Sequence, residues 1–124
     1  MTQSPPAPPE RTPTVLVVLV ARDAAAWLRD TVAALAAQTY PRMAVLGVDD
    51  GSADDSREIL EQALGERRVI GLAGPHGMAS AFREAMEQPA ASEADLVLVL
   101  HDDAALDPDA VQRLVEAAVG IRQV

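Results

Sequence analysis

Residues Glu93–Pro108 read EADLVLVLHDDAALDP, and the rest of the chain is organised around this stretch. Its five consecutive apolar residues, Leu96–Leu100, include two β-branched valines, which predicts a strand buried on both faces. Such a strand cannot hold an unpaired carboxylate in its middle, because burying a charge is too costly. His101, Asp102 and Asp103 therefore mark the end at which the strand leaves the core. In open parallel sheets ligands bind at that end, and two adjacent carboxylates can hold a divalent cation that in turn holds a phosphate.

A second stretch repeats this pattern upstream. Met43–Val48 (MAVLGV) predicts a strand, and the loop Asp49-Asp50-Gly51-Ser52 follows it. Taken alone, each acidic stretch has an ordinary explanation, because Asp, Gly and Ser are common turn residues and strand ends are often solvated. As a ligand site, the carboxylates of this loop would accept hydrogen bonds from a nucleotide base or from ribose hydroxyls. The question is whether the two acidic loops face the same ligand.

The composition limits the chemistry. The chain has 124 residues, which suits one domain with a modest core, and its 2% aromatic content means that Ala, Val and Leu fill that core. Without Cys there is no disulfide framework and no thiolate metal site. All ten basic residues are Arg, so mechanisms that need a lysine, such as a Schiff base or a P-loop, are excluded. The net charge of −9 argues against nucleic-acid binding, although a bridging cation would still allow a nucleotide to bind.

The apolar runs are too short for a membrane span, which needs about 20 residues. Arg11 followed by Val15–Ala21 faintly resembles a signal peptide, but the apolar run is short and ends in Arg22 and Asp23, which favours a strand. We therefore expect a cytoplasmic protein. In a longer parent protein with membrane segments, the chain would lie at the cytoplasmic face of the membrane.

Strand and helix patterns alternate four times along the chain. The Pro-rich stretch Met1–Pro13 has no apolar period and predicts a disordered tail, which leaves residues 14–124 as the folded part. The alternation predicts a three-layer α/β/α sandwich with a mainly parallel sheet and right-handed crossovers. The predicted strands are Thr14–Ala21, Met43–Val48, Arg68–Leu72 and Leu96–Leu100.

The first helix is predicted to run from Ala24 to about Ala37. Asp23 stands where an N-cap residue would be, and Trp27 shares one face with the apolar residues that follow it. Pro41 cannot continue the helix, so the chain must leave it before that residue.

The later helices have similar signals. Acidic residues in Ser52–Asp55 are favoured near a positive helix end and predict the start of the second helix there. The third helix follows the turn Gly74–Gly77, and Gln88–Glu93 is predicted to be a loop. Asp107 is predicted to cap the last helix, with Pro108 at its first position.

Taken together, the motifs resemble the N-terminal half of family 2 glycosyltransferases with the GT-A fold. The resemblance covers Thr14 to about Ala118. It rests on VLVVLVARDAAAWLRDTVAALAAQTYP, VDDGSADDS, GPHGMASAFREAM and LVLHDDAALDPDAV, of which the QTYP close of the first helix and the VDDGS loop are the most family-specific. The resemblance implies a Rossmann-like nucleotide-binding half with strand order 3-2-1-4, and a C-terminal acceptor half that is absent from residues 14–124.

The same resemblance implies a nucleotide site. By position, Ala21 and Asp23 would line the base pocket, and Asp50, with Asp49 beside it, would bind the base or the ribose. Gly77 and Arg83 match a segment in which relatives often have Gly and Asn. Arg83 would then approach the diphosphate.

The family motif usually written Asp-x-Asp maps onto His101-Asp102-Asp103. The resemblance therefore implies that Asp103 binds Mn²⁺ or Mg²⁺ and that Asp102 binds the ribose or the metal. This chain departs from the motif at its first position, where it has His101. A lone His beside carboxylates is more often structural or solvent-facing than a ligand.

The implied reaction is displacement at the anomeric carbon of a nucleoside-diphosphate sugar, with inversion. The metal would neutralise the leaving group, and a general base would deprotonate an acceptor hydroxyl of unknown identity. That base is expected in the acceptor half, so the catalytic residue is unknown.

The alternative is a regulatory or nucleotide-binding module without catalysis. A response-regulator receiver has a similar sandwich, but it places its acidic pair after the first strand and requires a Lys, which this chain lacks. A half-fold would also leave the Leu96–Leu100 side of the sheet uncovered. Because exposed strand edges tend to pair with another chain, we expect some self-association.

Overall fold

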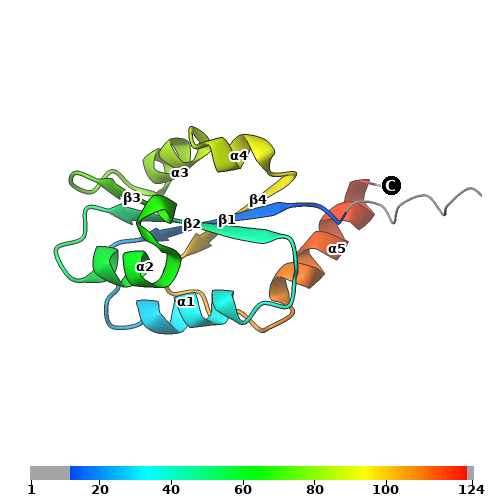
Figure 1. Ribbon diagram of the computed structural model, residues 1–124, viewed down its shortest axis with the longest axis horizontal. Coiled ribbons are helices and arrows are strands. Elements are labelled where there is room, and N and C mark those ends of the chain that lie inside the picture. The colour runs from blue at the N-terminus through cyan, green and yellow to red at the C-terminus, as the bar shows by residue number, and fades with distance from the viewer. Residues whose placement is uncertain (1–11, 123–124) are drawn as a thin grey trace, which may run out of the picture.

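The structure is a computed structural model that describes residues 12–122. One sheet contains β1 (Val15–Ala21), β2 (Met43–Asp50), β3 (Val69–Leu72) and β4 (Leu96–His101). Neighbouring strands are parallel and follow the order β3-β2-β1-β4 (Figure 1). The predicted strand order 3-2-1-4 is therefore confirmed. Of the predicted disordered tail, Met1–Arg11 lies outside the described residues.

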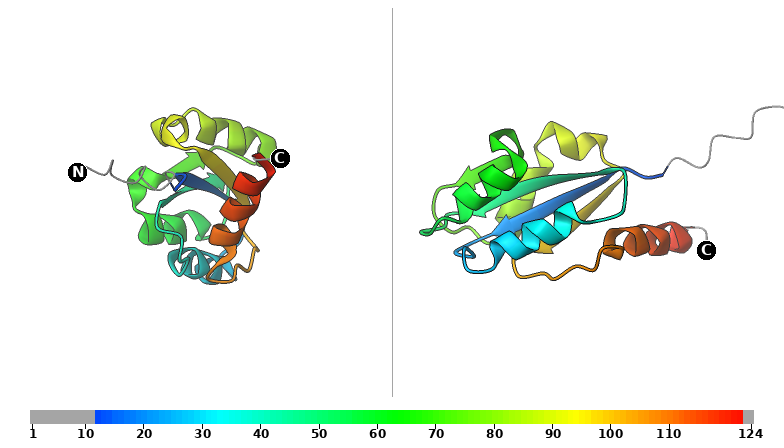
Figure 2. Two further views of the ribbon diagram at one scale, coloured as in Figure 1. Left: turned by 90° about the vertical axis from the view of Figure 1, so that its right-hand side faces the viewer. Right: turned by 60° about the horizontal axis from the view of Figure 1, so that its bottom comes forward.

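Helices cover both faces of the sheet, which confirms the predicted sandwich (Figures 1 and 2). One face packs against α1 (Leu28–Ala36), α2 (Ser56–Leu64) and the first turns of α5 (Ala110–Arg122). The other face packs against α3 (Met78–Met86) and α4 (Pro89–Glu93). A 3₁₀ helix, η1 (Glu66–Arg68), precedes β3. Within residues 12–122, no helix has the length and apolar character that crossing a membrane requires.

The central strand β1 supplies side chains to both cores. All seven of its residues are at most 5% exposed. Val15, Val17 and Leu19 pack with α1, α2 and α5, whereas the alternating residues pack on the side of α3 and α4. A strand covered on both faces must be apolar at every position, which explains the unbroken run of Val and Leu.

Strand β4 is not buried on both faces, so this prediction is wrong. Leu98 and Leu100 face the α1 side, whereas Val97 and Val99 are 37% and 39% exposed on the opposite face. The reason is topological, because β4 forms an edge of the sheet while α3 packs against β1 and β2. An apolar run alone does not show whether a neighbouring helix covers its second face.

The first helix starts later than predicted, at Leu28 instead of Ala24. Asp23 does not cap it, because its carboxylate accepts a hydrogen bond from the backbone N–H of Ala53 (2.7 Å). Trp27 is the N-cap residue and is 43% exposed, so it does not lie on the buried face of the helix.

Other boundaries also differ from the predictions. Strand β2 continues to Asp50, so Asp49 and Asp50 belong to the strand and not to the loop predicted after Val48. Ser52–Asp55 remains a loop, and α2 begins at Ser56. The predicted loop Gln88–Glu93 contains the short helix α4, whose first residue, Pro89, has no N–H to lose at that position.

Asp107 and Pro108 precede α5 and do not form its first turn. The N-terminus of α5 is instead held by Gln38, which follows α1. Its Oε1 accepts from the backbone N–H of Val111 (3.0 Å), and its Nε2 donates to the carbonyl of Asp107 (2.8 Å). Gln38, the first residue of the QTYP segment that follows α1, thus connects α1 to α5.

Candidate functional site

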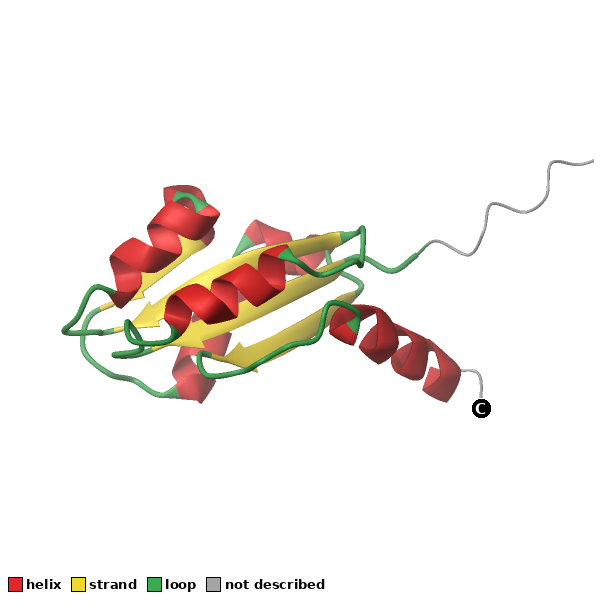
Figure 3. Cartoon of the chain, turned by 90° about the horizontal axis from the view of Figure 1, so that it is seen from below, coloured by secondary structure: helices red, strands yellow, loops and turns green. Residues whose placement is uncertain are grey.

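The carboxyl ends of the strands form one edge of the sheet. The register places Ala21 beside Asp49 and Val20 beside His101. Figure 3 shows the strand arrowheads at the same end of the sheet, away from α5. The loops that carry the predicted site residues therefore meet along a single edge.

The two aspartates that end β2 lie on opposite faces of the sheet. Val48 belongs to the core on the α3 side, so Asp50, two residues later, lies on that side as well. Asp49 pairs in register with Ala21, which belongs to the core on the α1 side. Of this doublet, Asp50 faces α3 and Asp49 faces α1.

The residues at the end of β4 also lie on opposite sides of the sheet. His101 pairs in register with Val20 and therefore lies on the α3 side. Asp102 lies on the α1 side, where its backbone carbonyl accepts from Thr31 Oγ1 of α1 (2.6 Å). The α3 side of the edge thus carries Asp50 together with His101.

Asp50 holds the loop that leads into α3. Its two carboxylate oxygens accept from the backbone N–H groups of His76 and Gly77, each at 2.8 Å, and it is 4% exposed. Gly51, at φ +70°, lies so close to this loop that an added Cβ would meet Gly74 at 2.5 Å. The β2–α2 and β3–α3 loops therefore fit closely together.

Asp49 is buried beneath the loops on the α1 side. One carboxylate oxygen, Oδ2, lies 3.4 Å from the backbone N of Ser52. The other, Oδ1, has no hydrogen-bond partner among the described residues, although Asp49 is 4% exposed. Ala21 beside it is fully buried, backbone included, so it presents no surface to a ligand in this structure.

Hydrogen bonds join the β1–α1 loop to the β2–α2 loop. Asp23 stands at φ +49° and accepts from Ala53, and Asp54 accepts from the backbone N–H of Ala25 (3.0 Å). Asp54 also accepts from Ser56 Oγ (2.6 Å), and this hydrogen bond is the main cause that lowers the pKa of the Asp54 carboxyl. Asp23 therefore stabilises the loops.

The turn after β4 brings together three potential metal ligands. His101 Nδ1 lies 2.8 Å from Asp103 Oδ1 and 3.3 Å from Asp102 Oδ1. Ligand atoms from all three residues lie within 4.8 Å of one another. One imidazole nitrogen and carboxylate oxygens form a donor set that fits a divalent cation such as Mn²⁺. The side chains of His101 and Asp103 are open to solvent, whereas Asp102 is buried.

Asp102 is surrounded by hydrogen-bond donors. Its Oδ2 accepts from the backbone N–H of Arg22 (3.0 Å), and its Oδ1 accepts from Trp27 Nε1 (3.2 Å). The sequence did not predict a role for Trp27 near the acidic turn. Its one signal is that the chain's single tryptophan stands at the start of the first helix.

Gly77 and Arg83 lie on or next to α3. Gly77 precedes the helix at φ +89°, and its backbone N–H reaches Asp50. Arg83 is an exposed residue in the last turn of α3, and no hydrogen bond or ion pair connects it to another described residue. The structure thus brings Gly77, but not Arg83, into contact with the acidic loops.

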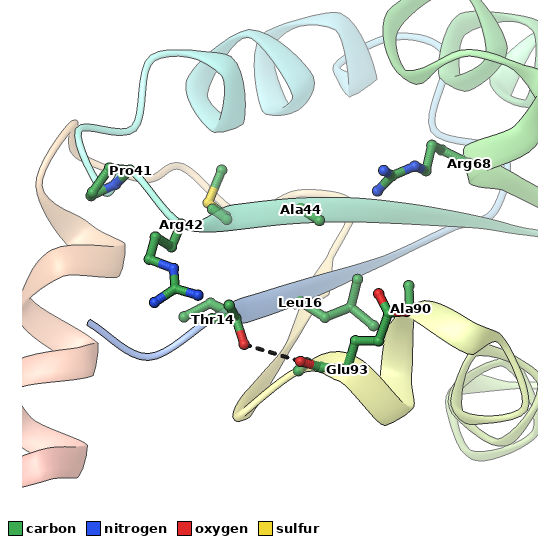
Figure 4. Close-up of a pocket in the computed structure, with 11 residues that line it drawn as sticks. Thr14, Leu16, Pro41, Arg42, Ala44, Arg68, Ala90 and Glu93 are labelled. Carbon is green, nitrogen blue, oxygen red and sulfur yellow. Dashed lines mark hydrogen bonds between the residues drawn. The ribbon is translucent and has the colours of Figure 1, made fainter. Parts of the chain in front are cut away.

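A cavity of about 300 Å³ lies at the opposite edge, at the amino ends of β1 and β2 and against α4. Figure 4 shows Arg42 and Arg68 among its lining residues, and a hydrogen bond from Thr14 Oγ1 to the carbonyl of Glu93 (3.2 Å). None of the predicted site residues lines this cavity. It is therefore separate from the acidic edge.

Residues 16–122 match the family model of glycosyl transferase family 2. The chain belongs to this family. The matched region contains the acidic loops after β2 and β4 together with the QTYP close of the first helix, and so confirms the family that the motifs resemble.

Solved structures share the fold of this family 2 chain. The mannosyltransferase PcManGT from Pyrobaculum calidifontis, in complex with GDP-Man and Mn²⁺, superposes with a TM-score of 0.72 at 20% identity. S. aureus TarS superposes with a TM-score of 0.70 at 23% identity in complex with UDP, and of 0.65 at 22% identity in complex with UDP-GlcNAc.

Each superposition covers 89% of the family 2 chain, and 32%, 32% and 31% of the three solved chains respectively. The chain thus spans about a third of the length of these solved chains, of which the two TarS chains are the fragment 1–349. A comparison with curated proteins gave no match.

Proposed function

We propose that this chain is the donor-binding part of an inverting glycosyltransferase. It would bind a nucleoside-diphosphate sugar through Mn²⁺ or Mg²⁺, and the sugar would pass to an acceptor hydroxyl. The observation that carries the proposal is that Asp50 and His101 lie on the α3 side of one sheet edge, with Asp103 Oδ1 2.8 Å from His101 Nδ1. Family membership and the nucleotide-sugar complexes of PcManGT and TarS support it.

The turn after β4 would hold the metal. Asp103 is its most exposed carboxylate, and His101 Nδ1 already lies 2.8 Å from it. A bound divalent cation would neutralise the charge that develops on the leaving nucleoside diphosphate. The negative charge of Asp103 would therefore be needed for the metal-dependent part of nucleotide binding.

Asp50 would contact the base or the ribose. Both of its oxygens accept one backbone N–H, and a carboxylate oxygen retains a second lone pair for a further donor. Gly77 would allow the loop backbone to approach the nucleotide closely. Asp23 would border the base through its backbone, because its side chain is bound to Ala53, whereas the fully buried Ala21 would only support the pocket.

The remaining predicted residues have weaker support. Asp49 faces the α1 side of the sheet, so its part in nucleotide binding would be to support the loop that carries Asp50. Arg83 would reach a diphosphate only if the ligand extended along α3. The acceptor and the general base remain unassigned.

Titration of the full chain with UDP and GDP tests the proposal. Each nucleotide is added with Mn²⁺, with Mg²⁺ and with EDTA, and binding is followed by calorimetry. We expect the cation to strengthen binding, Asp103→Asn to remove that gain, and Asp50→Ala to weaken binding even in EDTA. Asp30→Asn is the matched control, because it removes an exposed carboxylate of α1. If Asp103→Asn binds nucleotide and metal as well as the parent chain does, the assignment is wrong.

A further inference from the structure

We propose that Asp102 and Trp27 are positioning residues for the acidic turn. In this assignment Asp102 is not the metal ligand. The indole N–H of Trp27 and the amide of Arg22 hold its carboxylate on the α1 side and thereby fix the turn that carries His101 and Asp103. The inference rests on the proposed function, because it concerns residues that would bind the metal there.

The first observation is the environment of Asp102. It is 3% exposed, and each carboxylate oxygen accepts an N–H group, from Arg22 at 3.0 Å and from Trp27 Nε1 at 3.2 Å. Its backbone carbonyl accepts from Thr31 Oγ1 at 2.6 Å. The Asp103 side chain, 70% exposed, offers the open space that a metal ion with its water and phosphate ligands requires, whereas Asp102 is held among these donors.

The second observation is the position of Trp27. Trp27 is 43% exposed, so burial in the core does not account for its orientation. Among the described residues, the hydrogen bond of its indole N–H goes to the Asp102 carboxylate. Hydrogen bonds to a charged acceptor are stronger than neutral ones. This bond therefore ties the start of α1 to the end of β4.

The third observation is how Asp102 connects to its neighbours. His101 Nδ1 lies 3.3 Å from Asp102 Oδ1 and 2.8 Å from Asp103 Oδ1. A change in the position of the Asp102 carboxylate would therefore move the imidazole and, with it, Asp103. Partners that orient metal ligands in this way commonly affect metal affinity without touching the metal.

Calorimetry of the full chain tests this role. UDP and GDP are titrated in Mn²⁺ and in EDTA for the parent chain, Trp27→Phe, Asp102→Asn and the control Asp30→Asn. Trp27→Phe retains an aromatic ring but loses the N–H donor. We expect both test variants to lose about tenfold or more of the affinity that Mn²⁺ adds, while binding in EDTA stays unchanged. Asp30→Asn should behave as the parent chain does.

Nuclear magnetic resonance provides a readout that needs no ligand. The chain has one tryptophan, so its spectrum contains one indole N–H signal. We expect Asp102→Asn to shift that signal, and both test variants to shift the amide signals of His101 and Asp103. Circular dichroism melting checks folding. If Asp102→Asn does not fold, Trp27→Phe still tests the positioning role, because Trp27 is 43% exposed and its replacement should not unfold the chain.

The outcomes separate the two proposals. If the parent chain shows Mn²⁺-dependent binding that Trp27→Phe and Asp102→Asn retain in full, the positioning role is refuted and the proposed function stands. Unchanged amide signals of His101 and Asp103 would refute it as well. If the parent chain shows no metal-dependent binding, the proposed function fails, and the positioning role for a metal site fails with it.

Discussion

Replacing Asp50 by Ala should loosen the β3–α3 loop and destabilise the whole domain. The parent carboxylate is 4% exposed and accepts two backbone N–H groups, from His76 and Gly77, at 2.8 Å each. Hydrogen bonds to a charged group contribute about 1.5–3 kcal/mol each, which gives a gross loss of about 3–6 kcal/mol. Alanine therefore leaves two donors without their acceptor.

The net loss should be smaller than this gross value. His76 and Gly77 are exposed, so water can reach the freed N–H groups, and the variant no longer buries a charged carboxylate. We expect a decrease in the free energy of unfolding of about 2 kcal/mol, which corresponds to a decrease in Tm of about 8 °C for a domain of this size.

Urea denaturation followed by circular dichroism measures this change. Hydrogen exchange of the amides of His76 and Gly77 shows whether the loop itself has loosened. Asp103→Asn is the control, because the Asp103 side chain is 70% exposed and should change stability by less than about 0.5 kcal/mol. If Asp50→Ala unfolds at the same urea concentration as the parent chain and its loop amides exchange no faster, Asp50 does not hold this loop.

Two further outcomes follow from the structure. The pKa of Asp54 is lowered chiefly by the hydrogen bond from Ser56, so the stability that Asp54 contributes is present above its unfolded pKa and is lost as the pH falls through the folded pKa. Urea denaturation should therefore show that Asp54→Asn costs more at about pH 6 than at about pH 2, and an equal cost at both would contradict the linkage. We also propose that the chain self-associates through the uncovered face of β4 around Val99. Sedimentation should show that the parent chain associates and that Val99→Arg reduces this association, even though the added Arg lowers the net negative charge. A parent chain that stays monomeric at high concentration would refute the proposal.

Local sequence signals were sufficient to predict the layers of the fold. An unbroken run of Val and Leu in Val15–Ala21 predicts a buried strand, and four alternations of strand and helix predict a parallel sheet. The acidic residues after Val48 and Leu100 then have to lie at one edge, because parallel strands end at the same side of a sheet. This much follows from residue type and spacing.

Caps and helix starts could not be predicted from the same local signals. Asp23 and Asp107 have the right side chain at the right place for an N-cap, but the structure uses Asp23 to hold Ala53 and uses Gln38 to hold α5. A short polar side chain accepts whichever donor lies within reach. At both positions, hydrogen-bond partners distant in the sequence determined that the aspartate does not cap the helix.

The tertiary structure decided how the two aspartates of each acidic pair differ in orientation and in hydrogen-bond partners. The sequence places Asp49 beside Asp50 and Asp102 beside Asp103 but gives each pair the same chemistry. Pairing with β1 then turns Asp49 towards the core on the α1 side, and the donors of the β1–α1 loop hold Asp102 on that side as well. Asp50 lies on the α3 side of the edge, and the Asp103 side chain is open to solvent. The sequence by itself determined that carboxylates gather at this edge, because charge cannot enter the core, and the tertiary structure determined which side of the sheet Asp49 and Asp50 face and which donors hold Asp102.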